Sequence, residues 1–200
     1  MGAGNGKTQP LEVGRLLAGR RLVVVGGTGF LGKVRWCFLL SRFPEIDHLY
    51  LVVREKKGLT AEQRFWKEII TAGLFDPLRK LHGDNFEAFV RSKVTPVAGD
   101  VVQPYCGLSA SVRDELTGRV DAVVNVAGVV DFDPPLDEAL EVNAFGVQNL
   151  VVLARELGNL PLLHTSTCYV AGSKTGFIEE DSPLDFPFPR ADELDRSHWD

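Results

Sequence analysis

The amino-acid sequence predicts a doubly wound α/β fold, with a parallel sheet in the strand order 3-2-1-4-5 and helices on both faces. Short apolar runs, which are typical of parallel strands buried on both faces, alternate with longer segments of helical periodicity. The apolar run at residues 22–25 leads directly into a turn with glycines at positions 26, 29 and 32. In this fold class such a turn lies where the strand order reverses, so the first strand is expected at the centre of the sheet.

The segment after the glycine turn is expected to form a helix that ends before Pro44, because proline disfavours helical backbone in the preceding residue. Near one face of this helix lie Phe30, Val34, Phe38 and Ser41. The apolar run at residues 48–53 predicts a second buried strand. Two parallel strands joined by one helix make a right-handed βαβ unit.

The middle of the chain is expected to be helical up to an edge strand. Residues 60–63 read T-x-x-Q, a capping box that predicts a helix ending before Gly73. One further helix is expected over residues 74–90, followed by a strand at residues 93–98. Because Pro96 cannot donate to a neighbouring strand, this third strand is expected at an edge of the sheet.

The second half repeats the alternation of strand and helix. An apolar run at residues 120–126 predicts a fourth strand, and a short fifth strand is expected at residues 162–165. Between them, residues alternating three and four apart predict the longest helix at residues 135–157. We expect an N-terminal arm at residues 1–20, with a short amphipathic turn around residues 11–17. The cofactor domain is expected at residues 21–180, and residues 181–200 as a loop leading into a substrate region that is not present.

The composition argues against several classes of function. A net charge of −5 and a pI near 5.4 argue against binding to nucleic acid, which favours a basic surface. No apolar run approaches the roughly 20 residues that span a membrane, and the first 21 residues lack the charged and apolar regions of a signal peptide, so export is not expected. A cytoplasmic location is expected, with peripheral membrane contact left open. The 3 cysteines and 4 histidines lack metal-ligand spacing, so no metal site is expected.

The glycine turn is the predicted dinucleotide site. Its spacing allows a tight turn, close approach of a diphosphate to the backbone, and close packing of the helix on the strand. The positive end of the following helix would then hold the diphosphate. The alternative is a glycine-rich turn that binds no ligand. The residues expected to contact the cofactor here are Gly26, Thr28, Gly29, Phe30, Leu31 and Gly32.

Further candidate residues follow the other strands, because ligands bind at the carboxyl ends of such sheets. Arg54 and Lys56 stand where an enzyme that prefers NADH usually has an acid on the ribose hydroxyls, although they also suit a solvated basic loop. After the third strand, Asp100 could accept from the adenine amino group, with Val101 beside it. After the fourth strand, small residues could bring the backbone against the cofactor or form an ordinary turn: Ala127, Gly128 and Val129.

Two polar features complete the candidate site. Asn143 is the one polar residue on the apolar stripe of the long helix, and we expect its amide to be buried and to tie neighbouring strands together. A structural role is favoured over a direct cofactor contact. The fifth strand ends in three consecutive hydroxyl residues at positions 165–167, where the reacting carbon of a nicotinamide should lie. In isolation such a run is also typical of a polar strand end.

Together these residues resemble the fatty acyl-CoA reductase group, also called male-sterility-type reductases. This group belongs to the extended and atypical short-chain dehydrogenase/reductases and is related to thioester reductase domains. The resemblance covers most of residues 22–180, and it implies a Rossmann-like fold. The motifs that carry it are G-G-T-G-F-L-G, L-Y-L-V-V-R-E-K-K-G, A-E-Q-R-F, L-F-D-P-L-R, V-T-P-V-A-G-D, G-L-S, V-D-F-D-P-P-L-D-E-A-L-E-V-N-A-F-G and S-T-C-Y-V-A-G.

The resemblance implies NADPH as cofactor, a fatty acyl-CoA or acyl-carrier thioester as substrate, and a catalytic set of Ser or Thr, Tyr and Lys. The Ser/Thr role falls on Thr167, with Ser166 next to it. The family's Y-x-x-x-K motif has no counterpart in these 200 residues, because no Tyr is followed four residues later by Lys. We therefore expect NADPH-dependent reduction of the thioester to an aldehyde and onward to the alcohol, with this chain inactive alone. The alternatives are a carrier-protein thioester reductase domain and a non-catalytic NADP-binding module.

Overall fold

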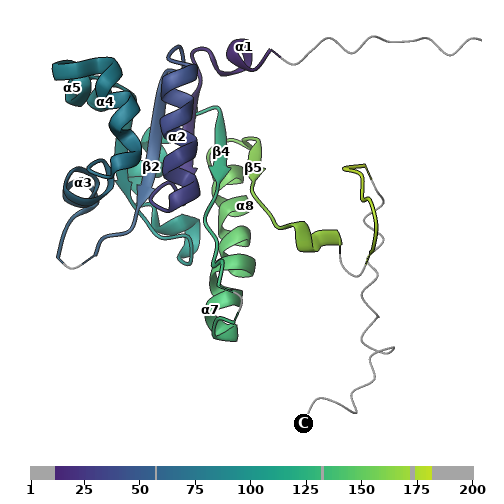
Figure 1. The fold of residues 1–200 in the computed structure, drawn as a ribbon. Coiled ribbons are helices and arrows are strands. Elements are labelled where there is room, and N and C mark those ends of the chain that lie inside the picture. Colours follow the sequence, from purple (N-terminus) through teal and green to yellow (C-terminus); the bar gives the residue numbers. More distant parts are fainter. Residues whose placement is uncertain (1–11, 57, 132, 172–173, 182–200) are drawn as a thin grey trace, which may run out of the picture. The chain divides into compact units, whose positions relative to one another are not determined.

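The computed structural model describes residues 12–56, 58–131, 133–171 and 174–181, and these form a parallel five-stranded sheet in the order β3-β2-β1-β4-β5 (Figure 1). The predicted fold class and strand order are confirmed. Each expected strand is present within about two residues of its expected bounds. Residues 1–11 of the expected arm and 182–200 of the expected loop lie outside the described residues. The strands are β1 Arg21–Val25, β2 His48–Val53, β3 Val94–Ala98, β4 Ala122–Asn125 and β5 Leu162–His164.

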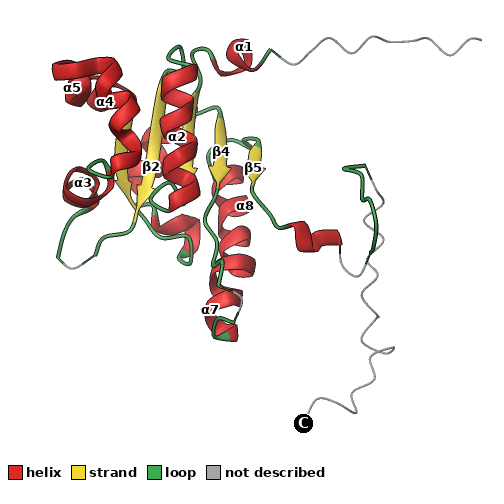
Figure 2. Cartoon of the chain, in the orientation of Figure 1, coloured by secondary structure: helices red, strands yellow, loops and turns green. Residues whose placement is uncertain are grey.

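Helices connect the strands and cover the sheet (Figure 2). The α-helices are α1 Val13–Leu17, α2 Phe30–Arg42, α3 Ala61–Arg64, α4 Asp76–His82, α5 Phe86–Lys93, α6 Ala110–Leu116, α7 Leu136–Leu140 and α8 Gly146–Glu156. Two π-helical turns, η1 Phe65–Ile69 and η5 Glu141–Phe145, extend α3 and join α7 to α8. Short 3-10 turns are η2 Gly73–Phe75, η3 Gly83–Asn85, η4 Pro104–Gly107 and η6 Cys168–Ala171.

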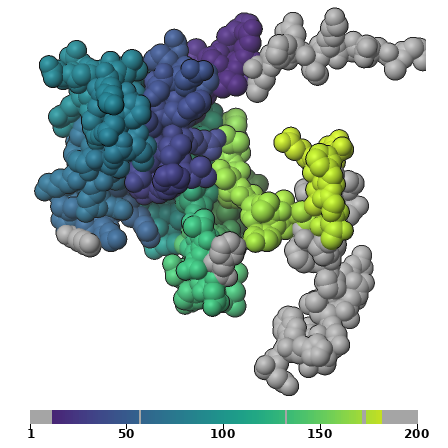
Figure 3. All heavy atoms as spheres, viewed as in Figure 1, coloured from purple at the N-terminus to yellow at the C-terminus, as the bar shows by residue number. Residues whose placement is uncertain are grey.

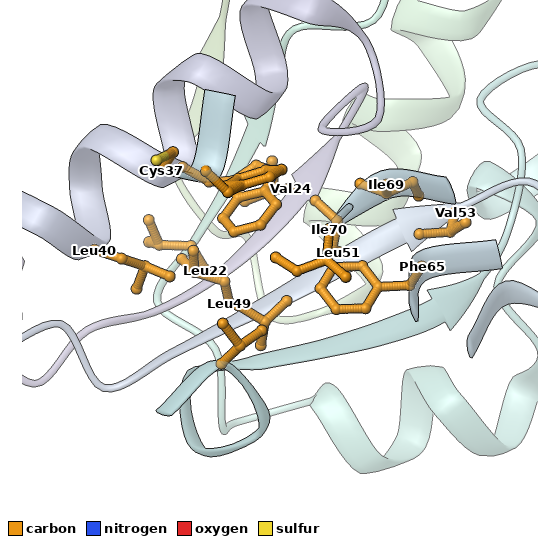
Figure 4. Close-up of a cluster of buried hydrophobic side chains, with 14 of the residues drawn as sticks. Leu22, Val24, Cys37, Leu40, Leu49, Leu51, Val53, Phe65, Ile69 and Ile70 are labelled. Carbon is orange, nitrogen blue, oxygen red and sulfur yellow. The ribbon is translucent and has the colours of Figure 1, made fainter. Parts of the chain in front are cut away.

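Two apolar cores lie on opposite faces of the sheet. On one face, Trp36 of α2 packs against Phe75, with ring centroids 4.4 Å apart, and alternate residues of β1 and β2 complete the layer (Figure 4). In Figure 3 the atoms of α2 lie directly beside those of the segment containing α4 and α5. On the other face, α8 places Leu150 and Leu153 against Val123 of β4. The expected coverage of both faces is confirmed.

The helix α2 buries a different face from the one that its phenylalanines mark. Phe30 and Phe38 lie on a common face, as expected, but their side chains are 79% and 54% exposed. The buried face carries Trp36, Cys37 and Leu40. Its position is fixed by Trp36, whose indole Nε1 donates to the carbonyl of Gly27 at 3.0 Å while its ring fills the core.

The single helix expected over residues 74–90 is wrong, because the segment folds as α4 and α5. Gly83 interrupts it with a φ of +52°, a left-handed conformation that a helix cannot contain. The helix α6 has no counterpart among the predicted elements. Ser109 caps it by accepting from the backbone N–H of Val112 at 3.3 Å, and Leu116 anchors its end in the core.

The long helix predicted at residues 135–157 is present, but it contains the π-helical turn η5. A π turn holds an extra residue, and it therefore shifts the phase of the apolar stripe. As a result α8 buries its stripe, whereas Leu136 of α7 is 74% exposed. Asn143 lies in the π turn and is exposed, so the expectation that its amide is buried in the core is wrong.

The chain divides into two compact units, Met1–His164 and Thr165–Asp200. The sheet belongs to the first unit. Within the described ranges, no helix is long and apolar enough to cross a membrane. The same ranges contain no cluster of His, Cys, Asp and Glu side chains that could hold a metal ion.

Candidate cofactor site

The turn after β1 is built for close backbone contact. Gly26 has a φ of +83°, and a Cβ at this position would overlap the backbone of Val126 and Ala127 after β4. A Cβ at Gly32 would overlap Gly26 and Gly27, so the first turn of α2 lies directly on the glycine turn. Both positions therefore require glycine for packing within the chain, whether or not a ligand is bound.

The N-terminus of α2 is open to a ligand. Gly29 occupies the N-cap position with extended backbone and supplies no side-chain cap, while its N–H donates to the carbonyl of Gly26 at 3.1 Å. A Cβ at Gly29 would make only an ordinary contact with that carbonyl, so packing does not explain this glycine. Phe30 and Leu31 are exposed beside it, and Thr28 is half-buried. Uncapped N–H groups at the positive end of a helix suit a phosphate.

Charged groups meet at the carboxyl ends of β2 and β3. The guanidinium Nη1 of Arg54 lies 3.9 Å from Oδ2 of Asp100, and both side chains keep part of their surface exposed. The carbonyl of Arg54 accepts from Nη1 of Arg64 at 2.7 Å, which holds the backbone of this residue in place. Asp100 is held by its own backbone N–H, which donates to the carbonyl of Cys106 at 2.8 Å.

Lys56 and Val101, which lie near these two residues in the sequence, differ in their exposure to solvent. Lys56 is exposed, and its backbone pairs with that of Leu59 in a small turn. Val101 is buried, and its carbonyl accepts from Nδ2 of Asn149 at 2.9 Å, so its side chain belongs to the core beneath the strand ends. Burial raises the pKa of Cys106 to about 12, so this thiol is a neutral filler rather than a nucleophile.

Asn143 holds the loop that follows β4. Its Oδ1 accepts from the N–H of Val129 at 2.9 Å, and its Nδ2 donates to the carbonyl of the same residue at 3.1 Å. The amide thus ties a loop to a helix rather than one strand to another. Gly128 lies close to Asn143, and Ala127 rests against Gly26. Of the three residues predicted after β4, Ala127 therefore lies beside the glycine turn, and Gly128 and Val129 lie beside Asn143.

One residue of this region is missing from the sequence-based site. Asn125, the last residue of β4, is 1% exposed and binds both Ala127 and His164 through its side-chain amide. The sequence does mark this residue, because Asn125 is one amide within an otherwise apolar strand, V-V-N-V. A buried amide needs specific hydrogen-bond partners, so such a residue is a candidate for a defined role.

The predicted catalytic residues lie in the second unit. Thr167 precedes η6, accepting from the N–H of Tyr169 through Oγ1 and from the N–H of Val170 through its carbonyl, both at 3.2 Å. Ser166 is exposed beside it. Both hydroxyls thus belong to a different compact unit from the glycine turn.

Comparison with known proteins places this arrangement among reductases. The family model described as male sterility protein, an NAD-binding domain, matches residues 24–194. Fatty acyl-CoA reductase 2, chloroplastic, of Arabidopsis thaliana is 33% identical over 88% of this chain and 29% of its own length. Fatty acyl-CoA reductase 8 of the same plant is 37% identical over 82% of this chain and 34% of its own length. The chain thus spans about a third of the length of these relatives.

Solved structures of reductase domains also resemble this chain. The terminal R domain from the myxalamid PKS-NRPS biosynthetic pathway superposes with a TM-score of 0.64 and 27% identity, covering 85% of this chain and 41% of that one. The reductase domain of a non-ribosomal peptide synthetase from Mycobacterium tuberculosis gives a TM-score of 0.59 and 25% identity, covering 80% and 37%. Both resemblances extend over the sheet and its helices.

Proposed function

Because the chain belongs to the male sterility protein family and forms its NAD(P)-binding domain, we propose that it is the cofactor-binding part of a reductase that acts on fatty acyl thioesters. The substrate proposed first is a fatty acyl-CoA, which is reduced to the fatty aldehyde with NADPH. A second reduction to the alcohol is the next step to test, since one relative is named alcohol-forming fatty acyl-CoA reductase, from Simmondsia chinensis.

One structural observation carries the proposal: the glycine turn, the open N-terminus of α2 and the loop after β4 share one edge of the sheet. Gly26 lies against Ala127, and Gly29 leaves the first N–H groups of α2 without a side-chain cap. These groups would hold the diphosphate, and the backbone of residues 127–129 would lie along the cofactor. The donors fit a dinucleotide, because they are backbone N–H groups at a helix N-terminus.

We assign the preference for NADPH to Arg54, with Lys56 close by in sequence. A 2′-phosphate carries negative charge, and a planar guanidinium can bind two of its oxygens at once. The neighbouring Asp100 would orient Arg54 and remain available to the adenine amino group. Asn143 would act indirectly, by holding the loop after β4.

The chemistry divides between the cofactor and the hydroxyl run. When bound, NADPH supplies a hydride to the thioester carbonyl carbon. The hydroxyl of Thr167, with Ser166 as its neighbour, would donate a hydrogen bond to the carbonyl oxygen as negative charge develops there. A Tyr and a Lys from a part of the reductase outside these 200 residues would complete the proton supply. Departure of the thiolate then leaves the aldehyde.

A second candidate substrate is an acyl group held on a carrier protein. The superposition with reductase domains of peptide synthetases, at TM-scores of 0.64 and 0.59, favours it. A third candidate from another class is a non-catalytic NADP-binding module, which the missing Y-x-x-x-K motif allows. The cytoplasmic location expected from the sequence stays a prediction, and one relative is named chloroplastic. The boundaries at residues 20 and 180 also stay predictions.

The test is acyl-CoA-dependent oxidation of NADPH by the longer reductase that contains this chain, measured across acyl chain lengths. We expect turnover with an acyl-CoA of at least one chain length and inhibition by neither free phosphopantetheine nor an unloaded carrier protein. Competition by an acyl-carrier protein would move the assignment to the second candidate. Binding of NADPH without turnover on either substrate would favour the non-catalytic module.

A further inference from the structure

Asn125 is the only fully buried polar side chain within the described ranges, and it joins the ends of two strands. It closes β4 and stands opposite His164, the last residue of β5, in the parallel register. Its amide spans from the loop after β4 to the ring of His164. The two ends that it joins lead into the proposed cofactor loop on one side and the hydroxyl run 165–167 on the other.

The orientation of this amide follows from its partners. The backbone N–H of Ala127 lies 3.0 Å from one end of the amide, and an N–H can only donate. That end is therefore the oxygen, Oδ1. The other end is the NH₂ group, which also lies 3.4 Å from the carbonyl of Ala127, an atom that can only accept. Both backbone contacts support the same orientation.

The orientation in turn selects one tautomer of the His164 ring. Nδ2 of Asn125 lies 2.9 Å from Nδ1 of His164, and an amide NH₂ can only donate. Nδ1 must then accept, so it carries no proton. In the neutral ring the proton is therefore on Nε2.

We propose that Asn125 is a positioning residue for the reduction: it selects the Nε2–H tautomer of His164 and holds the end of β5 beside the loop after β4. The expected effect on catalysis rests on the proposed function, whereas the tautomer of His164 follows from geometry alone. A chain of two hydrogen bonds, from Ala127 to Asn125 and from Asn125 to His164, fixes the backbone at which the hydroxyl run begins. Thr167 follows three residues later in the sequence.

The tautomer is tested by ¹⁵N NMR of the chain with labelled histidine rings. We expect Nδ1 of His164 to show the shift of an unprotonated nitrogen and Nε2 that of a protonated one, with assignment by loss of the signals in His164→Gln. In Asn125→Asp the carboxylate can accept from Ala127 but cannot donate, so we expect the proton to move to Nδ1. The matched control is Asn159→Asp, an exposed site, which should leave the ring signals unchanged.

A neutral wild-type ring with its proton on Nδ1 would overturn the inference even if Asn125→Asp fails to fold. Unchanged signals in Asn125→Asp would do the same. In the longer reductase, Asn125→Asp should lower kcat on the order of tenfold, since small misplacements remote from the chemistry slow turnover, while KM for NADPH changes little. Wild-type kcat in that variant would refute the positioning role. Absence of thioester reduction in the wild type would instead refute the proposed function and leave the tautomer result intact.

Discussion

Nη1 of Arg54 lies 3.9 Å from Oδ2 of Asp100, so the carboxyl ends of β2 and β3 are linked by a cation and an anion. Arg54 stands at the end of the strand next to the glycine turn, where a dinucleotide's ribose would lie. Its side chain is 67% exposed, so the ion pair contributes little to the stability of the fold. We therefore propose that the pair is a preorganised binding group rather than a structural one.

Arg54→Ala should weaken binding of NADPH by about tenfold to a hundredfold and binding of NADH much less, because a hydrogen bond to a charged phosphate contributes about 1.5–3 kcal/mol. Fluorescence titration of the chain with each cofactor measures both affinities. Arg42→Ala removes an exposed arginine at the far end of α2 and serves as the control, with no change expected. Equal weakening of the two cofactors would show that Arg54 does not contact the 2′-phosphate.

Gly26→Ala should destabilise the fold far more than Gly118→Ala. Both glycines have a φ above +70°, so each substitution introduces left-handed strain of about 1–2 kcal/mol. At Gly118 nothing lies within 4 Å of the added methyl group, whereas at Gly26 it meets the backbone of Ala127. Overpacking at Gly26 should add about 1–3 kcal/mol to this loss. Urea unfolding of the two variants measures the free energy of unfolding that each one loses. Similar losses at both positions would refute the close contact of the glycine turn with the loop after β4.

Stability should fall with acidification through His48. Its Nδ1 donates to the carbonyl of Ser92 and its Nε2 accepts from the hydroxyl of Thr95, at 3.2 and 2.8 Å. Burial lowers the pKa of His48 below the ordinary value of 6.5, although the Ser92 carbonyl and Asp47 act in the opposite direction. The unfolded chain then takes up the proton more readily. The contribution of neutral His48 is full above pH 6.5 and declines as the pH falls toward the lowered folded-state pKa.

Urea unfolding at a series of pH values measures this dependence. His48→Gln keeps a polar group but cannot titrate, so its stability should change less between neutral pH and the acid side of 6.5. A slope identical to that of the wild type would assign the dependence to other groups.

The outer edge of β5 predicts self-association of the 200-residue chain. Within the described part of the chain β5 pairs with β4 alone, and Leu163 on this strand is 54% exposed. An unpaired apolar edge promotes association with another chain. Leu163→Lys should reduce concentration-dependent association in sedimentation experiments. The control Leu81→Lys alters an exposed leucine on α4, 65% exposed, and should have little effect.

The strand order and the glycine turn could be predicted from the sequence because both rest on local patterns. An apolar run followed by glycines at fixed spacing has few other uses. Which face of α2 is buried was harder to predict from the sequence. Its phenylalanines and Trp36 lie on different faces, and only tertiary packing decides which of these faces enters the core. The helix break at Gly83 and the π turn at Asn143 also depend on packing. Neither leaves a distinctive local pattern.

The candidate site was predicted unevenly for the same reason. Residues directly after strands, such as Arg54 and Asp100, follow from the rule for ligand sites in open parallel sheets, and the structure brings these two together. Asn125 was missed because its importance arises from a partner 39 residues away in the sequence. The roles of Thr167 and Ser166 remain predictions.

We propose that these 200 residues bind the cofactor but lack the groups that complete catalysis. The most direct measurement is NADPH oxidation with a long-chain acyl-CoA by the purified monomeric chain, with NADPH binding measured on the same sample. General acid catalysis and oxyanion stabilisation each contribute on the order of a hundredfold or more, so without Tyr and Lys we predict weak binding and oxidation at background. Oxidation at an ordinary enzymatic rate, or no binding of NADPH at all, would contradict the claim.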